Sequence, residues 1–141
     1  MNIVTPNLQF TGNCENAIHL YEGAFNTKVD FILRYSDAKK EDFNIELNEN
    51  EKNYIYHAEM KIGNQRIMFS DVMTFKVIHG NSIFLTITFE TKEEVENAFN
   101  ILKENGEILI PLRKTTYSSS VGTLIDKYGI RWGLMTEQTE K

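Results

Sequence analysis

The fold of this chain is decided by the stretch Tyr54-Ile-Tyr-His-Ala-Glu-Met-Lys-Ile-Gly-Asn-Gln-Arg-Ile-Met-Phe-Ser-Asp71. Two alternating runs flank the turn signal Gly63-Asn64, a pattern typical of a β-hairpin. The apolar side chains share one face: Tyr56, Ala58, Met60, Ile67 and Phe69. The opposite face carries His57, Glu59, Met68 and Ser70. A histidine and a carboxylate two residues apart on a strand point to the same side, so this face is a candidate wall of a binding site.

The chain before the hairpin predicts a strand, a helix and a second strand. Residues 7–11 alternate as a strand, and Gly12-Asn13 then interrupts it. Asn13 is a suitable N-cap for a helix from Cys14 to about Phe25. Residues 28–35 alternate again, and residues 37–53 are highly charged with weak periodicity. We expect this charged segment to be a surface excursion, since loops of such length are uncommon unless functional or mobile.

The chain after the hairpin predicts the same elements once more. Residues 72–82 read as a connection and residues 83–89 as a strand. Thr91 and Glu94 form a capping box for a helix that runs to about Asn105, with Gly106 at its C′ position. A strand over residues 107–112 and a hairpin, with strands over 117–125 and 130–136, complete the order.

This order is an internal βαβββ repeat within one α+β domain over residues 1–141. Module one covers about residues 5–72 and module two about residues 82–137. Neither module is large enough to bury a stable hydrophobic core by itself. We expect each helix to cover the apolar face of its own sheet. The opposite faces should then form a cupped cleft between the two sheets.

Composition excludes several classes of partner. The 141 residues carry a net charge of −5 and are 41% hydrophobic. No basic patch interleaved with aromatic residues and no apolar run of membrane-spanning length occurs, so we expect neither nucleic acid nor membrane as a partner. The first six residues lack the features of a signal peptide, and Cys14 is the single cysteine, which favours the cytoplasm. We expect Cys14 to be a buried helix residue; the alternative is a reactive thiol.

Several segments together resemble the PhnB-like family of the vicinal oxygen chelate superfamily, which includes glyoxalase I, fosfomycin and bleomycin resistance proteins and extradiol dioxygenases. The resemblance covers nearly the whole chain. It rests on Thr5-Pro6…Phe10-Thr-Gly-Asn-Cys-Glu-Asn-Ala-Ile-His-Leu-Tyr21…Phe25, Tyr56-His-Ala-Glu59, Ile67-Met-Phe-Ser-Asp71, Phe99…Leu102 and Asp126-Lys-Tyr-Gly-Ile-Arg-Trp132. Members of this branch are often labelled as ubiquinone methyltransferases. The sequence has no glycine-rich loop suited to a methyl donor, so we do not expect that activity.

Metal-dependent members of the superfamily hold a divalent cation through His, Glu or Gln on the first and last strands of each module. The cation acts as a Lewis acid on substrate oxygens. Carried over by strand alternation, those positions are Gln9, Met68, Thr86 and Gly133. This set contains no histidine and no carboxylate, whereas a hard or borderline cation needs several such ligands. A shift by one residue brings in only apolar side chains: Leu8, Phe10, Ile67, Phe69, Leu85, Ile87, Trp132 and Leu134. We therefore expect the usual metal site to be missing and no cofactor to be required.

His57 and Glu59 are the leading candidates for ligand contact, beside Met68 and Ser70. His57 is suited to act as a general base or hydrogen-bond partner oriented by Glu59. Two alternatives remain: a pair of ligands for a metal placed elsewhere, or a structural hydrogen-bonded pair. Further cleft candidates are Gln9, Thr86 and Arg131, of which Arg131 is suited to a carboxylate or phosphate group.

The other polar residues are weaker candidates. Asp71 would cap or close the loop that follows it, with ligand contact as the less favoured reading. Residues 117–120 form a polar strand start that would reach the cleft, although serine clusters usually indicate loop. We expect His19 to be solvated, assign no role to His79, and expect Trp132 and Leu134 to be core.

Two functions of different classes follow. The first is a binding protein for a small organic molecule with a metal-free cleft, assembled as a homodimer. The second is a metal-dependent lyase, isomerase or dioxygenase. In that case the divalent metal is bound by other residues than those that strand alternation assigns. We favour the first, because catalysis in this superfamily depends on the cation.

Overall fold

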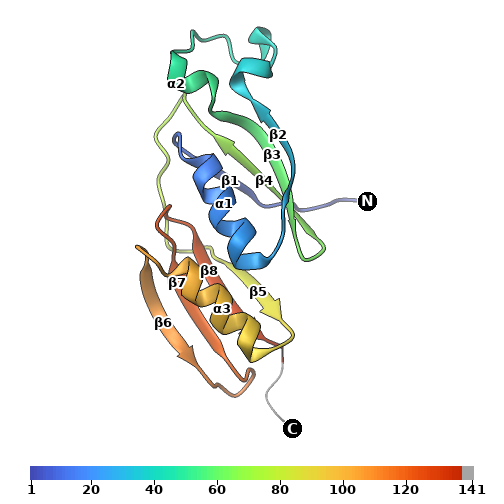
Figure 1. Ribbon diagram of the computed structural model, residues 1–141, viewed down its shortest axis with the longest axis vertical. Helices are drawn as coiled ribbons and strands as arrows, with labels where there is room; N and C mark the ends of the chain where they lie inside the picture. Colours follow the sequence, from blue (N-terminus) through green and yellow to red (C-terminus); the bar gives the residue numbers. More distant parts are fainter. Residues whose placement is uncertain (138–141) are drawn as a thin grey trace. The chain divides into compact units, whose positions relative to one another are not determined.

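The computed structural model describes residues 1–137 and divides the chain into two compact units, Met1–Val77 and Ile78–Lys141. The boundary falls inside the predicted connection over residues 72–82. Each unit contains one four-stranded sheet and one long helix (Figure 1).

The first unit contains β1 (Asn7–Phe10), α1 (Cys14–Phe25), β2 (Val29–Arg34), β3 (Ile55–Ile62) and β4 (Gln65–Asp71). The strand order is β1-β4-β3-β2, with β1 parallel to β4 and the other neighbours antiparallel. The charged excursion forms two 3-10 turns, η1 (Tyr35–Asp37) and η2 (Lys40–Asp42), and the short helix α2 (Glu49–Lys52).

The second unit contains β5 (Leu85–Phe89), α3 (Lys92–Leu102), β6 (Glu107–Arg113), β7 (Val121–Ile125) and β8 (Arg131–Thr136). Its strand order is β5-β8-β7-β6, again with one parallel pair, β5 and β8. The two sheets therefore have the same topology, and the predicted α+β fold of two βαβββ modules is confirmed.

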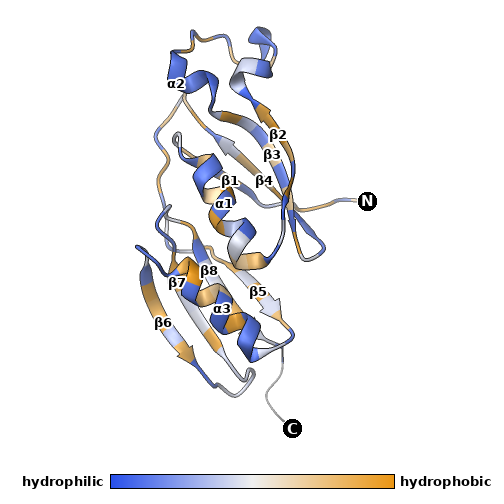
Figure 2. Cartoon of the chain, viewed as in Figure 1, coloured by the Kyte–Doolittle hydropathy of each residue, from blue (hydrophilic) through white to orange (hydrophobic). Residues whose placement is uncertain are grey.

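Both long helices pack on their own sheets through one apolar stripe, as predicted. α1 buries Cys14, Ala17, Ile18, Tyr21 and Ala24. The ring of Tyr21 stacks on that of Phe69 in β4, with centroids 6.1 Å apart. α3 packs on β8 and β5 through Val95, Ala98, Phe99 and Leu102. Hydrophobic and hydrophilic residues accordingly lie on different sides of both helices (Figure 2). Each large buried side chain contributes about 1.5–3 kcal/mol, so these stripes hold the helices in place.

The hairpin differs from its prediction at one residue. The turn at Gly63-Asn64 is confirmed, with Gly63 at φ 61°. Ala58, Met60, Ile67 and Phe69 are buried as expected, but Tyr56 is only half-buried and Ile55 is buried in its place. The cause is a bulge: Leu33 pairs with His57 whereas the next residue, Arg34, pairs with Ile55. A bulge inserts one residue into the strand and so reverses the alternation beyond it.

Both helices start where predicted, but the end of α3 and the cap of α1 differ from the prediction. Asn13 occupies the N-cap of α1 without a side-chain cap bond. The capping box of Thr91 and Glu94 is confirmed, but α3 ends at Leu102 and Asn105, not Gly106, takes the left-handed conformation at φ 58°. Gly106 is required for a different reason, because a Cβ there would lie 2.3 Å from the carbonyl oxygen of Ile125.

Two strands also start later in the sequence than predicted. β5 begins at Leu85, and the predicted strand residues Ile83 and Phe84 are exposed. β7 begins at Val121, so residues 117–120 are not strand. They form a turn in which Ser118 and Ser119 bond the hydroxyl of Thr136.

Candidate functional site

Five of the predicted site residues lie on one face of the first sheet. Phe69 meets α1, so its neighbours Met68 and Ser70 point to the opposite face. Glu59 pairs with Met68 across β3 and β4, and Gln9 pairs with Ser70 across β1 and β4. His57 lies two residues before Glu59 on β3. We call the face that carries Gln9, His57, Glu59, Met68 and Ser70 the open face.

His57 and Glu59 form a direct pair on the open face. The Nε2 atom of His57 lies 2.8 Å from Oε2 of Glu59, and their side chains are 31% and 27% exposed. Nη1 of Arg66 lies 3.5 Å from the other oxygen of Glu59. The hydrogen bond from His57, followed by the charge of Arg66, lowers the pKa of Glu59. The carboxylate is therefore ionised at neutral pH and fixes one ring nitrogen of His57.

Two apolar side chains, Phe31 and Met68, flank this pair. Phe31 pairs with Glu59 across β2 and β3, is 49% exposed, and holds its ring 6.2 Å from that of His57. On the other side, Asn7 reaches the sulfur of Met68 at 4.0 Å. The open face thus brings together a histidine, a carboxylate and a thioether, with the aromatic ring of Phe31 beside them.

Thr86 and Arg131 belong to the second unit. Thr86 pairs with Gly133, where a Cβ would come within 2.9 Å of the Thr86 hydroxyl and 3.1 Å of the Phe84 ring. Nε of Arg131 donates to the carbonyl of Gly80 at 2.9 Å. This bond ties Arg131 to the segment before β5, so part of its guanidinium is already engaged. A role in ligand contact for Thr86 and Arg131 stays a prediction.

The positions that the resemblance predicts for a metal supply donors that do not fit a divalent cation. In the first unit these positions supply the amide of Gln9 and the thioether of Met68, and in the second unit the hydroxyl of Thr86 and the bare backbone of Gly133. Across residues 1–137, moreover, no three His, Cys, Asp or Glu side chains gather as a metal site would require. The pair of His57 and Glu59 alone offers two ligands, and Arg66 beside Glu59 competes with a cation.

The carboxylate of Asp71 stabilises the fold, because backbone N–H groups of the first unit occupy it. It is 1% exposed, and its carboxylate accepts the backbone N–H groups of Gly12, Cys14 and Ile55 at 2.7, 3.0 and 2.9 Å. The phenol of Tyr35 donates to its carbonyl at 2.7 Å. The prediction that Asp71 closes the following loop is wrong, because it caps the preceding helix α1 instead.

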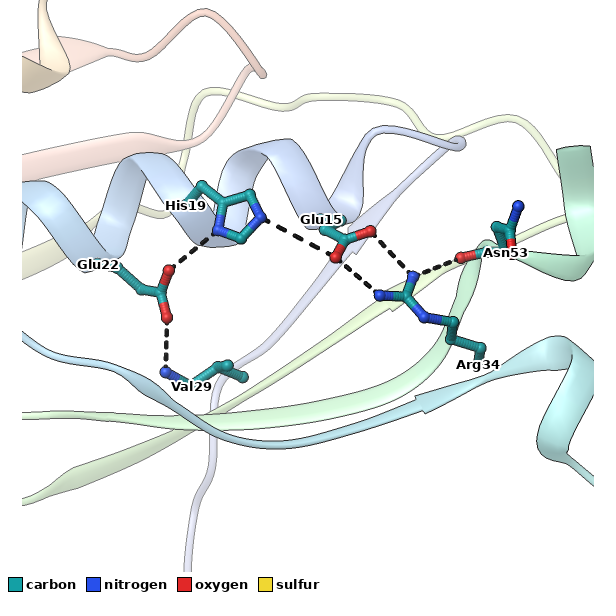
Figure 3. Close-up of polar contacts among 6 residues, drawn as sticks. All are labelled: Glu15, His19, Glu22, Val29, Arg34 and Asn53. Carbon is teal, nitrogen blue, oxygen red and sulfur yellow. Dashed lines mark hydrogen bonds and ion pairs between the residues drawn. The ribbon is translucent and has the colours of Figure 1, made fainter.

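His19 lies on the outer surface of α1, as predicted. Its side chain is 62% exposed, and Nδ1 lies 3.0 Å from Glu22, whereas Nε2 lies 3.9 Å from Glu15. The same Glu15 binds Arg34, so His19 sits at the edge of a surface ion-pair network (Figure 3).

Sequence reasoning missed a pocket in the charged excursion. It has a volume of about 340 Å³ and is lined by Tyr35, Ser36, Ala38, Lys40, Phe43, Ile45, Glu46, Leu47 and Lys52. The rings of Tyr35, Phe43 and Tyr56 pack against one another with centroids 5.1–5.9 Å apart. In the sequence, this pocket could have been anticipated from the apolar residues Phe43 and Ile45 within an otherwise charged segment.

The sequence matches a protein family described as 3-demethylubiquinone-9 3-methyltransferase over residues 2–135. The chain belongs to this family. The Escherichia coli (strain K12) protein YjdN is 25% identical over 134 residues, which cover 92% of this chain and 91% of that protein.

Solved structures agree with this assignment. Protein PA1353 from Pseudomonas aeruginosa has a TM-score of 0.84 at 26% identity, covering 99% of this chain and 100% of that one. A Bacillus cereus PhnB protein, described as a putative 3-demethylubiquinone-9 3-methyltransferase, has a TM-score of 0.72 at 28% identity, covering 96% of this chain and 99% of that one. The resemblance to PhnB-like proteins is therefore confirmed at the level of the family.

A fosfomycin resistance protein shares the architecture. The fosfomycin resistance protein FosX from Listeria monocytogenes has a TM-score of 0.63 at 10% identity, covering 97% of this chain and 94% of that one. This likeness concerns the architecture alone. Within residues 1–137, no helix is both long and apolar enough to span a membrane.

Proposed function

We propose that this member of the family binds a small organic molecule on the open face of the first sheet, without a metal. The observation that carries the proposal is the half-exposed pair of His57 and Glu59, whose donor and acceptor atoms lie 2.8 Å apart. The pair lies on the sheet face opposite α1 and is partly exposed, so a bound molecule would be able to reach both side chains. The sequence has no glycine-rich loop suited to a methyl donor, so the proposal is binding and not methyl transfer.

The geometry indicates what kind of ligand would be recognised. When Nε2 of His57 carries the proton and donates to Glu59, Nδ1 of the neutral ring keeps a free lone pair. A hydroxyl or amine of the ligand would donate to Nδ1, while its apolar part would lie against Phe31 and Met68. Ser70 and Gln9 would add further polar contacts on the same face.

The experiment is a thermal-shift screen of small hydroxylated and amine-bearing compounds, followed by calorimetric titration of each hit. His57→Ala is expected to weaken binding about tenfold or more, which corresponds to about 1.4 kcal/mol, and to leave the melting temperature nearly unchanged. The matched control is His19→Ala, since His19 also pairs with a glutamate but lies on the outer surface of α1. A large loss of stability with no change in binding would show that the pair is structural.

The metal-free part of the proposal has its own test. Elemental analysis is performed on the purified protein before and after incubation with nickel, zinc or manganese. We expect no stoichiometric retention. One metal per chain held at sub-micromolar affinity would overturn this part and favour a lyase, isomerase or dioxygenase.

We also propose that the protein works in the cytoplasm as a homodimer. The single cysteine, which is buried, supports a reducing compartment because no internal disulfide can form. The dimer is supported by the exposed apolar residues of β6.

A further inference from the structure

A second pocket lies within the second unit, where α3 begins, β6 ends and β7 starts. Its volume is about 290 Å³, near the lower limit for ligand sites and large enough for one small group. It is lined by Lys92, Glu96, Leu112, Arg113, Lys114, Ser119 and Ser120. None of these residues belongs to the open face.

The lining is positive although the chain is negative. Three cations and one carboxylate meet here, in a protein whose net charge is −5. Lys92 lies 4.0 Å from Glu96, which neutralises part of the charge. Among residues 1–137, Arg113 and Lys114 make no ion pair with an acidic side chain. Two cations are thus left without an anionic partner.

Ser120 adds a hydroxyl to the lining of the pocket. This residue is 2% exposed and lines the pocket. Its backbone N–H and C=O both bond the hydroxyl of Ser118, but within the described chain its own hydroxyl makes no hydrogen bond. The neighbouring Ser118 and Ser119 hydroxyls, by contrast, both bond Thr136. Among residues 1–137, the buried side-chain atom without a partner is Oγ1 of Thr115, not the hydroxyl of Ser120. The Ser120 hydroxyl therefore remains accessible from the pocket and can donate to a bound group.

We propose that this pocket binds a phosphate or sulfate group of a small molecule. Arg113 offers a planar fork of N–H donors, Lys92 and Lys114 offer point charges, and Ser120 donates its free hydroxyl. These donors come from α3, β6 and the turn before β7, so they approach from several directions and suit a tetrahedral oxyanion better than a planar carboxylate. The N-terminus of α3 is not needed, because Thr91 and Glu94 already cap it.

The test is calorimetric titration of the full chain with inorganic phosphate at low ionic strength, with chloride and acetate at equal ionic strength as comparisons. Saturable phosphate binding that sulfate competes for is expected. Arg113→Gln should weaken it at least tenfold, and Ser120→Ala about fivefold with no loss of melting temperature. The matched control is Lys103→Gln, which removes one exposed charge from the same unit outside the pocket.

Three results would overturn the proposal: no saturable phosphate binding, equal weakening by Lys103→Gln and Arg113→Gln, or acetate binding as tightly as phosphate. The site is independent of the proposed function. His57→Ala should leave phosphate binding unchanged, so failure of either proposal can be recognised separately.

Discussion

Asp71 shows how one side chain joins three parts of the first unit. Its carboxylate binds backbone N–H groups before α1, at the start of α1 and at the start of β3. Burial raises its pKa, while the three N–H groups act in the opposite direction. The bonds from Cys14 and Ile55 are buried, so these two N–H groups would otherwise lack a partner, which indicates a large contribution to stability.

We expect Asp71→Ala to lower the free energy of unfolding by about 2–4 kcal/mol, since it leaves buried N–H groups unpaired. Urea denaturation followed by circular dichroism measures the change. The control Asp30→Asn alters an exposed carboxyl on β2 and should cost less than about 0.5 kcal/mol. Similar losses for the two variants would show that Asp71 has no special role.

The reactivity of the Cys14 thiol also depends on its surroundings. The thiol is fully buried, and burial, together with the charges of Asp71 and Glu15, raises its pKa. Because the thiolate is the reactive form, we expect a thiol reagent to label Cys14 only when the chain unfolds. The labelling rate should rise with urea in parallel with unfolding. Rapid stoichiometric labelling of the native protein would instead support the reactive-thiol alternative.

At the scale of elements, a bidentate ion pair ties α1 to the end of β2. Both oxygens of Glu15 accept bonds from Arg34, at 2.9 and 2.8 Å, and Arg34 also donates to the carbonyl of Asn53 at 2.8 Å (Figure 3). The hydrogen bond from Arg34 lowers the pKa of Glu15, although burial opposes it. Helix, strand and excursion are thereby joined at one guanidinium.

This pair predicts a pH dependence. Because the pKa of Glu15 is lower in the folded state, its contribution is complete above the ordinary glutamate pKa of about 4.3 and is lost as the pH falls through the folded value. We expect Glu15→Gln to cost about 0.5–1 kcal/mol at pH 7, discounted for partial exposure. Urea denaturation at pH 7 and at pH 3 should show that the difference from wild type shrinks at low pH.

The control for this prediction is Glu104→Gln, an exposed glutamate with no ion pair to a basic side chain among residues 1–137. It should leave stability unchanged at both pH values. A pH-independent cost of Glu15→Gln would mean that packing, not charge, carries the effect.

At the scale of the whole molecule, β6 stands out as an apolar edge strand. Its consecutive residues Ile108, Leu109 and Ile110 are 44%, 37% and 45% exposed, and hydrophobic colour runs along the strand (Figure 2). An exposed apolar edge offers unpaired backbone groups to another chain unless it is covered. This supports the proposed homodimer.

We expect light scattering after gel filtration to give twice the chain mass of 16.4 kDa. Ile110→Lys should shift the protein toward the monomer, because it places a charge on the edge. Ile78→Lys, which alters an apolar residue that is 87% exposed outside the sheets, is the matched control. A wild-type monomer at micromolar concentration, or equal effects of both variants, would contradict the dimer through β6.

The sequence by itself determined the elements whose signals are local. Alternation, 3.6-residue spacing, the Gly63-Asn64 turn and the Thr91–Glu94 box involve residues a few positions apart, so they predicted the βαβββ repeat and the face that carries His57 and Glu59. Only the tertiary structure decided the rest. Asp71 binds N–H groups up to 59 residues away, the bulge at Tyr56 depends on the register with β2, and the pocket around Ser120 joins three separate elements. Such features depend on contacts between distant segments, which no local pattern encodes.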